Sequence, residues 1–171
     1  MPQALEIFGG YLWHLTKDYA HTLLWSELDD QGNPLDEGST WKHLSQAALW
    51  TLAQDVLSFL DAMQAVANTE AANPSSPRES PSAVVGQTPA SDQSPLGRYL
   101  HDHSLDSWSF HELTQLTHDL ALSRNGHGAG FFDGNWEFTG YEGLCGQLQA
   151  LARTQGERHL YRTESGVIEI L

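Results

Sequence analysis

The chain has 171 residues, of which 40% are hydrophobic, and this is enough for one domain with a hydrophobic core. Its 22 acidic and 8 basic residues give a formal net charge of −14, which repels nucleic-acid backbones and anionic membranes and favours basic partners. The single cysteine, Cys145, excludes an intramolecular disulfide, and the lack of a signal-peptide pattern or a bilayer-length apolar run predicts a cytoplasmic protein with no membrane partner.

Two helices are predicted in the amino-terminal half, residues 1–68. Apolar residues recur at three- and four-residue steps over 5–25, and the turn sequence DDQGNP then ends this helix. A second helix, rich in alanine and leucine and free of proline, is expected over 41–68. Residues 69–95 hold five of the seven prolines and very little apolar surface, so they are predicted to form a flexible insertion.

The carboxyl-terminal half, residues 96–171, is predicted to mix helices and strands. Ser109 and Glu112 have capping-box spacing, so a helix is expected over 109–118. Residues 118–124 alternate like a half-buried strand, Asn125 and Gly126 give a strong hairpin signal, and 129–138 can return as the partner strand. A second capping box, Thr139 with Glu142, opens a helix that ends near residue 154, and 157–171 form a terminal hairpin.

These elements predict the α+β fold class. The two hairpins form a small antiparallel sheet of about four strands, and the helices pack against it as a layer. Both halves then belong to one composite domain, interrupted by the insertion.

The sequence SRNGHGAGFFDG, residues 123–134, is the strongest candidate for a ligand site. A dinucleotide-binding loop is followed directly by a helix, whereas a strand is expected after this segment. A triphosphate-binding loop requires Lys-Ser or Lys-Thr, which this segment lacks. Arg124 could clamp a carboxylate or phosphate, while a carboxylate could orient His127 as a general base, with Ser123 or water as nucleophile. A purely structural hairpin is the alternative. The candidate ligand-binding residues are His118, Asp119, Arg124, Asn125, His127 and Asp133.

The nine histidines do not predict a metal site. His101 with His103 and His14 with His21 lack the spacing of a structural zinc site, and a second cysteine is missing. The acidic loop, residues 27–37, lacks the ligand order of a calcium loop. We therefore predict no metal and no cofactor, and the set of catalytic residues is incomplete.

Two segments resemble a family of small proteins encoded by bacteriophages, plasmids and other mobile elements. AHTLLWSELDDQGNPLDEG is similar to the family pattern AxxALWSxxDDxGxPLD, and HDLALSRNGHGAGFFDG is similar to HDFWLTRNGHGAGFWD. Leu120 and Ala121 replace an aromatic pair of the family motif, and Phe132 replaces a tryptophan. The shared residues are Leu24, Trp25, Ser26, Asp29, Asp30, Gly32, Pro34, Leu35 and Asp36 in the first motif, and His118, Asp119, Arg124–Phe131 and Asp133 in the second. The resemblance implies a small accessory protein directed at host defence or host metabolism.

Two functions follow from these features. The first is a non-enzymatic acidic protein that binds and inhibits a host factor, with a nucleic-acid-binding protein as the natural partner and DNA mimicry as the mechanism. The second is a protein that binds or hydrolyses a nucleotide-like anion at the 123–134 segment. A third possibility is that Asp29 and Asp30 form a buried ion pair with Arg124, which would make both motifs structural. The candidate partner-binding residues are Glu27, Asp29, Asp30, Asp36 and Glu37.

Overall fold

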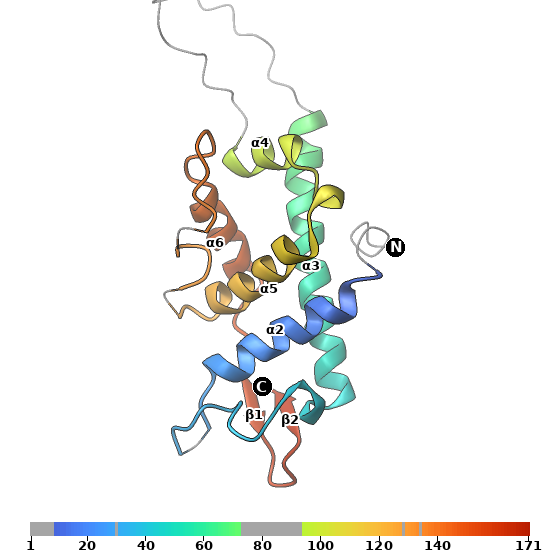
Figure 1. Cartoon of the computed structure of the whole chain (residues 1–171), viewed down its shortest axis with the longest axis vertical. Coiled ribbons are helices and arrows are strands. Elements are labelled where there is room, and N and C mark those ends of the chain that lie inside the picture. Colours follow the sequence, from blue (N-terminus) through green and yellow to red (C-terminus); the bar gives the residue numbers. More distant parts are fainter. Residues whose placement is uncertain (1–8, 30, 73–93, 128, 134) are drawn as a thin grey trace, which may run out of the picture.

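The computed structural model describes residues 9–29, 31–72, 94–127, 129–133 and 135–171, and it is mostly helical (Figure 1). The described α-helices are α2 (Leu12–Ser26), α3 (Gln46–Ala72), α4 (Pro95–Asp102), α5 (Phe110–Arg124) and α6 (Leu144–Thr154). Two 3₁₀ helices, η1 (Trp41–His43) and η2 (Leu105–Ser107), and two strands, β1 (Leu160–Arg162) and β2 (Ile168–Ile170), complete them.

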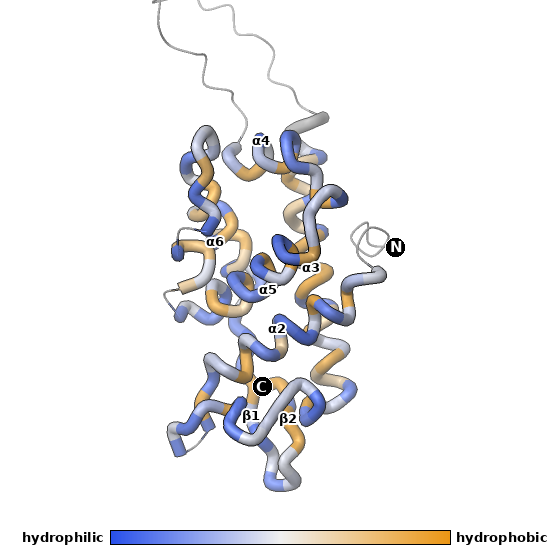
Figure 2. Tube along the Cα trace, viewed as in Figure 1, coloured by the Kyte–Doolittle hydropathy of each residue, from blue (hydrophilic) through white to orange (hydrophobic). Residues whose placement is uncertain are grey.

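The long helix α3 extends along the molecule, and the shorter helices pack around it (Figure 1). α2 lies beside α5 and crosses α3, while α6 packs against α5, α4 and α3. The β1–β2 hairpin lies near the start of α3, where the Ser45 amide donates to the Ile168 carbonyl at 3.0 Å. Hydrophobic stretches recur along α3 where the other helices cover it (Figure 2).

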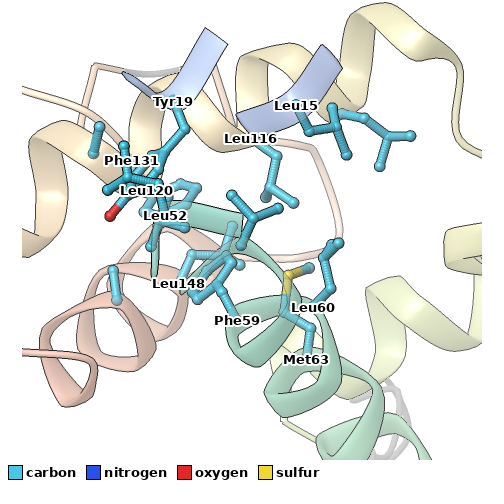
Figure 3. Close-up of a cluster of buried hydrophobic side chains, with 14 of the residues drawn as sticks. Leu15, Tyr19, Leu52, Phe59, Leu60, Met63, Leu116, Leu120, Phe131 and Leu148 are labelled. Atoms are coloured by element: carbon cyan, nitrogen blue, oxygen red, sulfur yellow. The ribbon is translucent and has the colours of Figure 1, made fainter. Parts of the chain in front are cut away.

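One hydrophobic core joins the two halves of the chain (Figure 3). Phe131, which is fully buried, stacks on Phe59 of α3 with ring centroids 5.9 Å apart. Full burial of such a side chain stabilises the fold by about 1.5–3 kcal/mol. The labelled core residues are Leu15 and Tyr19 of α2, Leu52, Phe59, Leu60 and Met63 of α3, Leu116 and Leu120 of α5, Phe131, and Leu148 of α6.

The two predicted amino-terminal helices are confirmed with shifted bounds. The first covers Leu12–Ser26, and residues 5–8 of the prediction lie outside the described residues. The second begins later, because η1 precedes it and the Ser45 hydroxyl accepts the Ala48 amide at 3.0 Å where α3 begins. It continues to Ala72, into the stretch predicted as a flexible insertion. Residues 73–93 of that insertion lie outside the described residues.

The predicted hairpin over 118–138 is wrong. Residues 118–124 are the last turns of α5, and no strand occurs among the described residues of 129–138. Asn125 caps the helix, and the Gly126 and His127 amides donate to the Ser123 and Leu122 carbonyls at 3.4 and 3.2 Å. This pair of bonds, with Gly126 at φ +70°, is the usual glycine-terminated helix end. Asn-Gly fits a helix end and a hairpin turn alike, because both need a residue with positive φ.

The two predicted capping boxes have different outcomes. The Ser109 hydroxyl accepts the Glu112 amide at 3.3 Å and the Glu112 carboxylate accepts the Ser109 amide at 2.7 Å, so the first box is confirmed. The second box is wrong, because α6 begins only at Leu144, after Gly143 at φ +91°, without a side-chain cap. The predicted end of this helix near residue 154 is confirmed.

The terminal hairpin is confirmed as an antiparallel pair. Leu160 lies opposite Ile170, and Arg162 lies opposite Ile168. The fold is therefore α+β, but the described sheet has two strands rather than the predicted four. None of the described helices is long and apolar enough to cross a membrane.

Candidate functional site

Arg124, the predicted anion clamp, lies inside the protein at the end of α5. Its fully buried side chain forms an ion pair with Asp55 Oδ2 of α3 at 2.9 Å and donates to the Tyr19 hydroxyl of α2 at 2.5 Å. It also donates to the Gln155 and Gly156 carbonyls, at 2.8 and 2.7 Å, where α6 ends and a cation stabilises the helix dipole. All three guanidinium nitrogens are therefore bonded within the protein, and Arg124 crosslinks helices rather than facing a ligand.

Asp55 is the carboxylate that pairs with Arg124, so the expectation that Asp29 would do so was wrong. Asp55 also accepts two hydrogen bonds from Arg158, both at 2.8 Å, and this hydrogen bonding raises the pKa of the Arg158 guanidinium. Burial raises the pKa of the Tyr19 hydroxyl, which keeps it protonated beside the ion pair. The four side chains form a buried polar network in which each charge has a partner.

Asn125 joins the 123–134 segment to the acidic loop. The hypothesis that both motifs are structural expected such a contact, but between Arg124 and Asp29 or Asp30. The Asn125 side-chain amide donates to Glu27 Oε1 at 3.0 Å and to the Arg158 carbonyl at 2.7 Å. Its side-chain oxygen accepts the Arg158 amide at 2.8 Å. Asn125 therefore fixes the chain that leads into β1.

Gly130 allows the motif to fold back onto α5. The Phe131 amide donates to the Ser123 hydroxyl at 3.1 Å, which brings the Gly130 backbone against the helix. A Cβ on Gly130 would meet the Ser123 hydroxyl and, at 2.7 Å, the Asp119 carbonyl oxygen, and the residue has φ +86°. Only glycine fits both the space and this backbone conformation.

His127 and Asp133 are exposed on the surface beyond α5. Among the described residues no hydrogen bond joins their side chains, and the structure does not bring His127 to Asp119. Asp119 bonds instead to His118, whose Nδ1 donates to Asp119 Oδ1 at 3.0 Å. The catalytic pairing predicted for His127 is therefore not assembled in this structure.

His118 and Asp119 form a pair in which a buried carboxylate orients a half-exposed imidazole. Asp119 is 1% exposed and accepts from Trp136 Nε1 at 2.7 Å and from Gln115 Nε2 at 3.0 and 3.1 Å. The His118 side chain is 45% exposed, and its Nδ1 bond to Asp119 leaves Nε2 available for a ligand.

A polar hollow of about 450 Å³ lies beside His118, between α2 and α5. His21, Asp18 and Thr22 of α2 and Phe110 of α5 also line it. Burial raises the pKa of Asp18, although the histidines at 14 and 21 and Lys17 act against this rise. Asp18 and Thr22 are not among the predicted site residues. The available signal in the sequence was the spacing of His14, Asp18 and His21, which places them on one helical face.

The acidic loop is held by its own side chains and by the terminal hairpin. Glu27 bonds to Asn125 and to His159, and Asp29 Oδ1 accepts the amides of residues 31 and 33, both at 2.9 Å. These amide bonds lower the pKa of Asp29. Arg162 donates to main-chain carbonyls of the loop, including that of Glu37 at 3.1 Å.

Of the predicted partner-binding residues, Glu37 is exposed and Asp36 half-buried. Glu27 and Asp29 stabilise the loop by the bonds just described. Asp30 lies outside the described residues.

A second hollow, of about 590 Å³, lies next to the start of α6 and was missed by the sequence analysis. Phe132, Trp136, Phe138 and Tyr141 line it together with acidic residues at 137 and 142. The density of aromatic residues over 131–141 was the available signal. We call it the aromatic hollow.

A third hollow, of about 680 Å³, lies between α2 and α3 and is apolar. Trp13 and Trp50 line it and are exposed. The Lys17 ammonium lies over the rings of Trp13 and Trp41, 5.2 and 4.9 Å from their centroids. No carboxylate lines this hollow among the described residues, so that part of its lining does not suit a basic ligand.

Among the described residues, no group of three His, Cys, Asp or Glu side chains is placed to hold a metal ion. The buried Cys145 thiol has a raised pKa, chiefly because burial disfavours the thiolate. Comparisons of the chain with protein-family models, with curated proteins and with solved structures found no match. The resemblance to mobile-element proteins stays a prediction.

Proposed function

We propose that the chain is a non-enzymatic acidic accessory protein of a phage or other mobile element, which binds and inhibits a host factor in the bacterial cytoplasm. Its partner would be a basic, nucleic-acid-binding or defence protein. The exposed carboxylates would occupy the surface that the partner uses for nucleic acid, without direct binding of nucleic acid by the chain itself.

The use of arginines inside the fold is the observation that carries this proposal. Arg124 and Arg158 both bond to Asp55, and Arg162 bonds to the loop carbonyls of Leu35 and Glu37. Three of the eight basic residues thus serve internal contacts in a chain of net charge −14. The pairing of Arg124 with Asp55 cancels inside the fold, so the net negative charge of the chain stays on its surface, and the motif arginine is unavailable to an anionic ligand.

Capture from a bacterial lysate with two matched variants would test this function. Asp36→Asn with Glu37→Gln removes two charges from the acidic loop, and Glu137→Gln with Glu142→Gln removes two from the aromatic hollow. We expect the wild-type chain to enrich a basic protein, duplex DNA to compete, and one double variant to lose the partner. Capture that neither DNA nor added salt weakens would contradict a DNA-mimic mechanism.

Binding or turnover of a small ligand at His118 is a second candidate, which the buried Asp119 carboxylate behind the imidazole favours. Such a carboxylate fixes the tautomer of a general base. Thermal unfolding across a nucleotide panel would test it, with His118→Gln as the variant and His111→Gln, an exposed histidine of the same helix, as the control. A stabilisation lost only in His118→Gln would support this candidate, and a flat panel would count against it.

A further inference from the structure

The aromatic hollow has the size and the lining of a site for an organic cation. Its volume of about 590 Å³ falls among those of small-ligand pockets, about 300–1,000 Å³. Phe132, Trp136, Phe138 and Tyr141 supply aromatic walls, and Phe132 is 57% exposed. Aromatic faces attract cations through the ring quadrupole, and cages of this kind bind alkylammonium and guanidinium groups.

The walls of the hollow are held in place from outside it. Trp136 Nε1 donates to the buried Asp119 carboxylate at 2.7 Å, so the indole cannot swing away. Phe138 stacks on Tyr99 of α4 with centroids 5.3 Å apart and planes 4° from parallel. The Tyr141 hydroxyl donates to Asp102 Oδ2 at 2.6 Å. A cation would therefore enter a preformed site and would order few side chains on binding.

The charge of the hollow also selects a cation. Glu137 and Glu142 are exposed and line it. Hydrogen bonds from its own amide and from the Gly140 amide lower the pKa of Glu142, so this carboxylate is ionised at neutral pH. Arg98 of α4 lies close enough to lower that pKa further, and its buried Nε has no hydrogen-bond partner among the residues that the structure describes. Two carboxylates against one guanidinium leave the site negative.

We propose that the aromatic hollow binds the arginine or lysine side chain of a basic protein segment. The aromatic faces take the cation, and Glu137 and Glu142 pair with it. This inference rests on the proposed function, since it names the part of the acidic surface that a basic partner would contact. It also gives that surface a specific contact, beyond the general attraction of its net charge.

Binding of a short arginine- and lysine-containing peptide to the full chain would test the inference by fluorescence anisotropy. The same peptide with citrulline and norleucine, which keep the shape and lose the charge, is the ligand control. Phe138→Leu removes an aromatic face, and Glu137→Gln with Glu142→Gln removes the carboxylates. Glu157→Gln with Glu164→Gln removes two exposed charges elsewhere. Urea unfolding midpoints would confirm that each variant is folded.

We expect the neutral peptide and the Glu137/Glu142 variant to bind at least about tenfold more weakly, and Phe138→Leu about fivefold more weakly. The Glu157/Glu164 variant should change affinity less than about twofold. Peptide binding that is unchanged in both hollow variants would overturn this inference and leave the proposed function standing.

Failure of the wild-type chain to bind the peptide at low salt would contradict the proposed function and the inference together. In that case, binding of tetramethylammonium would test the cation site independently of any basic protein partner. If it shifts the NMR signals of Phe138 and Tyr141 in the wild-type chain, it supports a cation site that serves no basic protein. If those signals stay unmoved, the cation site itself is overturned.

Discussion

Replacement of Arg124 by methionine should severely destabilise the fold. The substitution keeps an unbranched side chain in a site that is fully buried, but it removes the ion pair with Asp55 and the bonds to Tyr19 and to the end of α6. Breaking a buried pair by removing one partner costs about 3–5 kcal/mol. Arg158 still holds Asp55 with two bonds, so we expect the lower part of that range, about 3 kcal/mol.

Urea unfolding followed by tryptophan fluorescence measures this loss. Domains of this size unfold with a free energy of about 5–15 kcal/mol, so a loss of about 3 kcal/mol lowers the midpoint clearly. Arg153→Met, at an exposed arginine of α6, is the matched control and should change stability by less than about 0.5 kcal/mol. If Arg124→Met were as stable as the control, Arg124 would not be a structural crosslink, and a role in ligand binding would regain support.

Three further predictions concern local features. In urea unfolding, Gly130→Ala should destabilise the protein more than Gly126→Ala. Both positions have a positive φ, which costs alanine about 1–2 kcal/mol, but only a side chain at position 130 would also clash with α5. Equal losses of stability would contradict the close approach of Gly130 to the helix. Ser109→Ala should cost about 0.5–2 kcal/mol, since it removes the cap of α5, and an unchanged midpoint would refute that cap. A hydrogen bond to Glu157, together with a second carboxylate, raises the pKa of His159. The protonated His159 therefore contributes stability below the pKa of the unfolded state, about 6.5, and this contribution is lost as pH rises through the pKa of the folded state. His159→Gln should therefore destabilise the protein at pH 5.5 and have little effect at pH 8.5 in the same assay, and a pH-independent effect would contradict this assignment.

The elements predictable from the sequence are those set by neighbouring residues. The Ser109–Glu112 box involves residues three apart, and it fixed the start of α5. The terminal hairpin was likewise predicted from two short segments on either side of the turn residues 164–166, where Gly166 has φ +82°. Such features need no knowledge of the rest of the fold.

The end of α5 could not be predicted because it is buried on nearly all sides. Leu120, Ala121, Leu122, Ser123 and Arg124 are all buried, so no helical stripe of polar residues remains to contrast with the core. A short alternation then resembled a strand, and the Asn-Gly signal supported that error.

The structural role of Arg124 could not be predicted, because its ion-pair partner lies far away in the sequence. Asp55 lies in the middle of a helix that reads as a simple apolar stripe, and nothing near it in sequence marks it as the partner of Arg124. The aromatic hollow was hidden for the same reason, because its walls are fixed by residues of α4 and α5. The sequence indicated which residues of the motif matter, while only the packing shows that Arg124 and Asn125 act inside the protein.

The most direct test of a function carried by the acidic surface is the salt dependence of binding to a basic polypeptide. The dissociation constant of the full chain for the arginine- and lysine-containing peptide would be measured across a series of salt concentrations. We expect affinity to fall steeply as salt rises, and the fall to be shallower for Glu137→Gln with Glu142→Gln, because surface charges are screened within about 10 Å at 0.1 M salt. An affinity that does not change with salt, or no binding even at low salt, would contradict a function carried by the acidic surface.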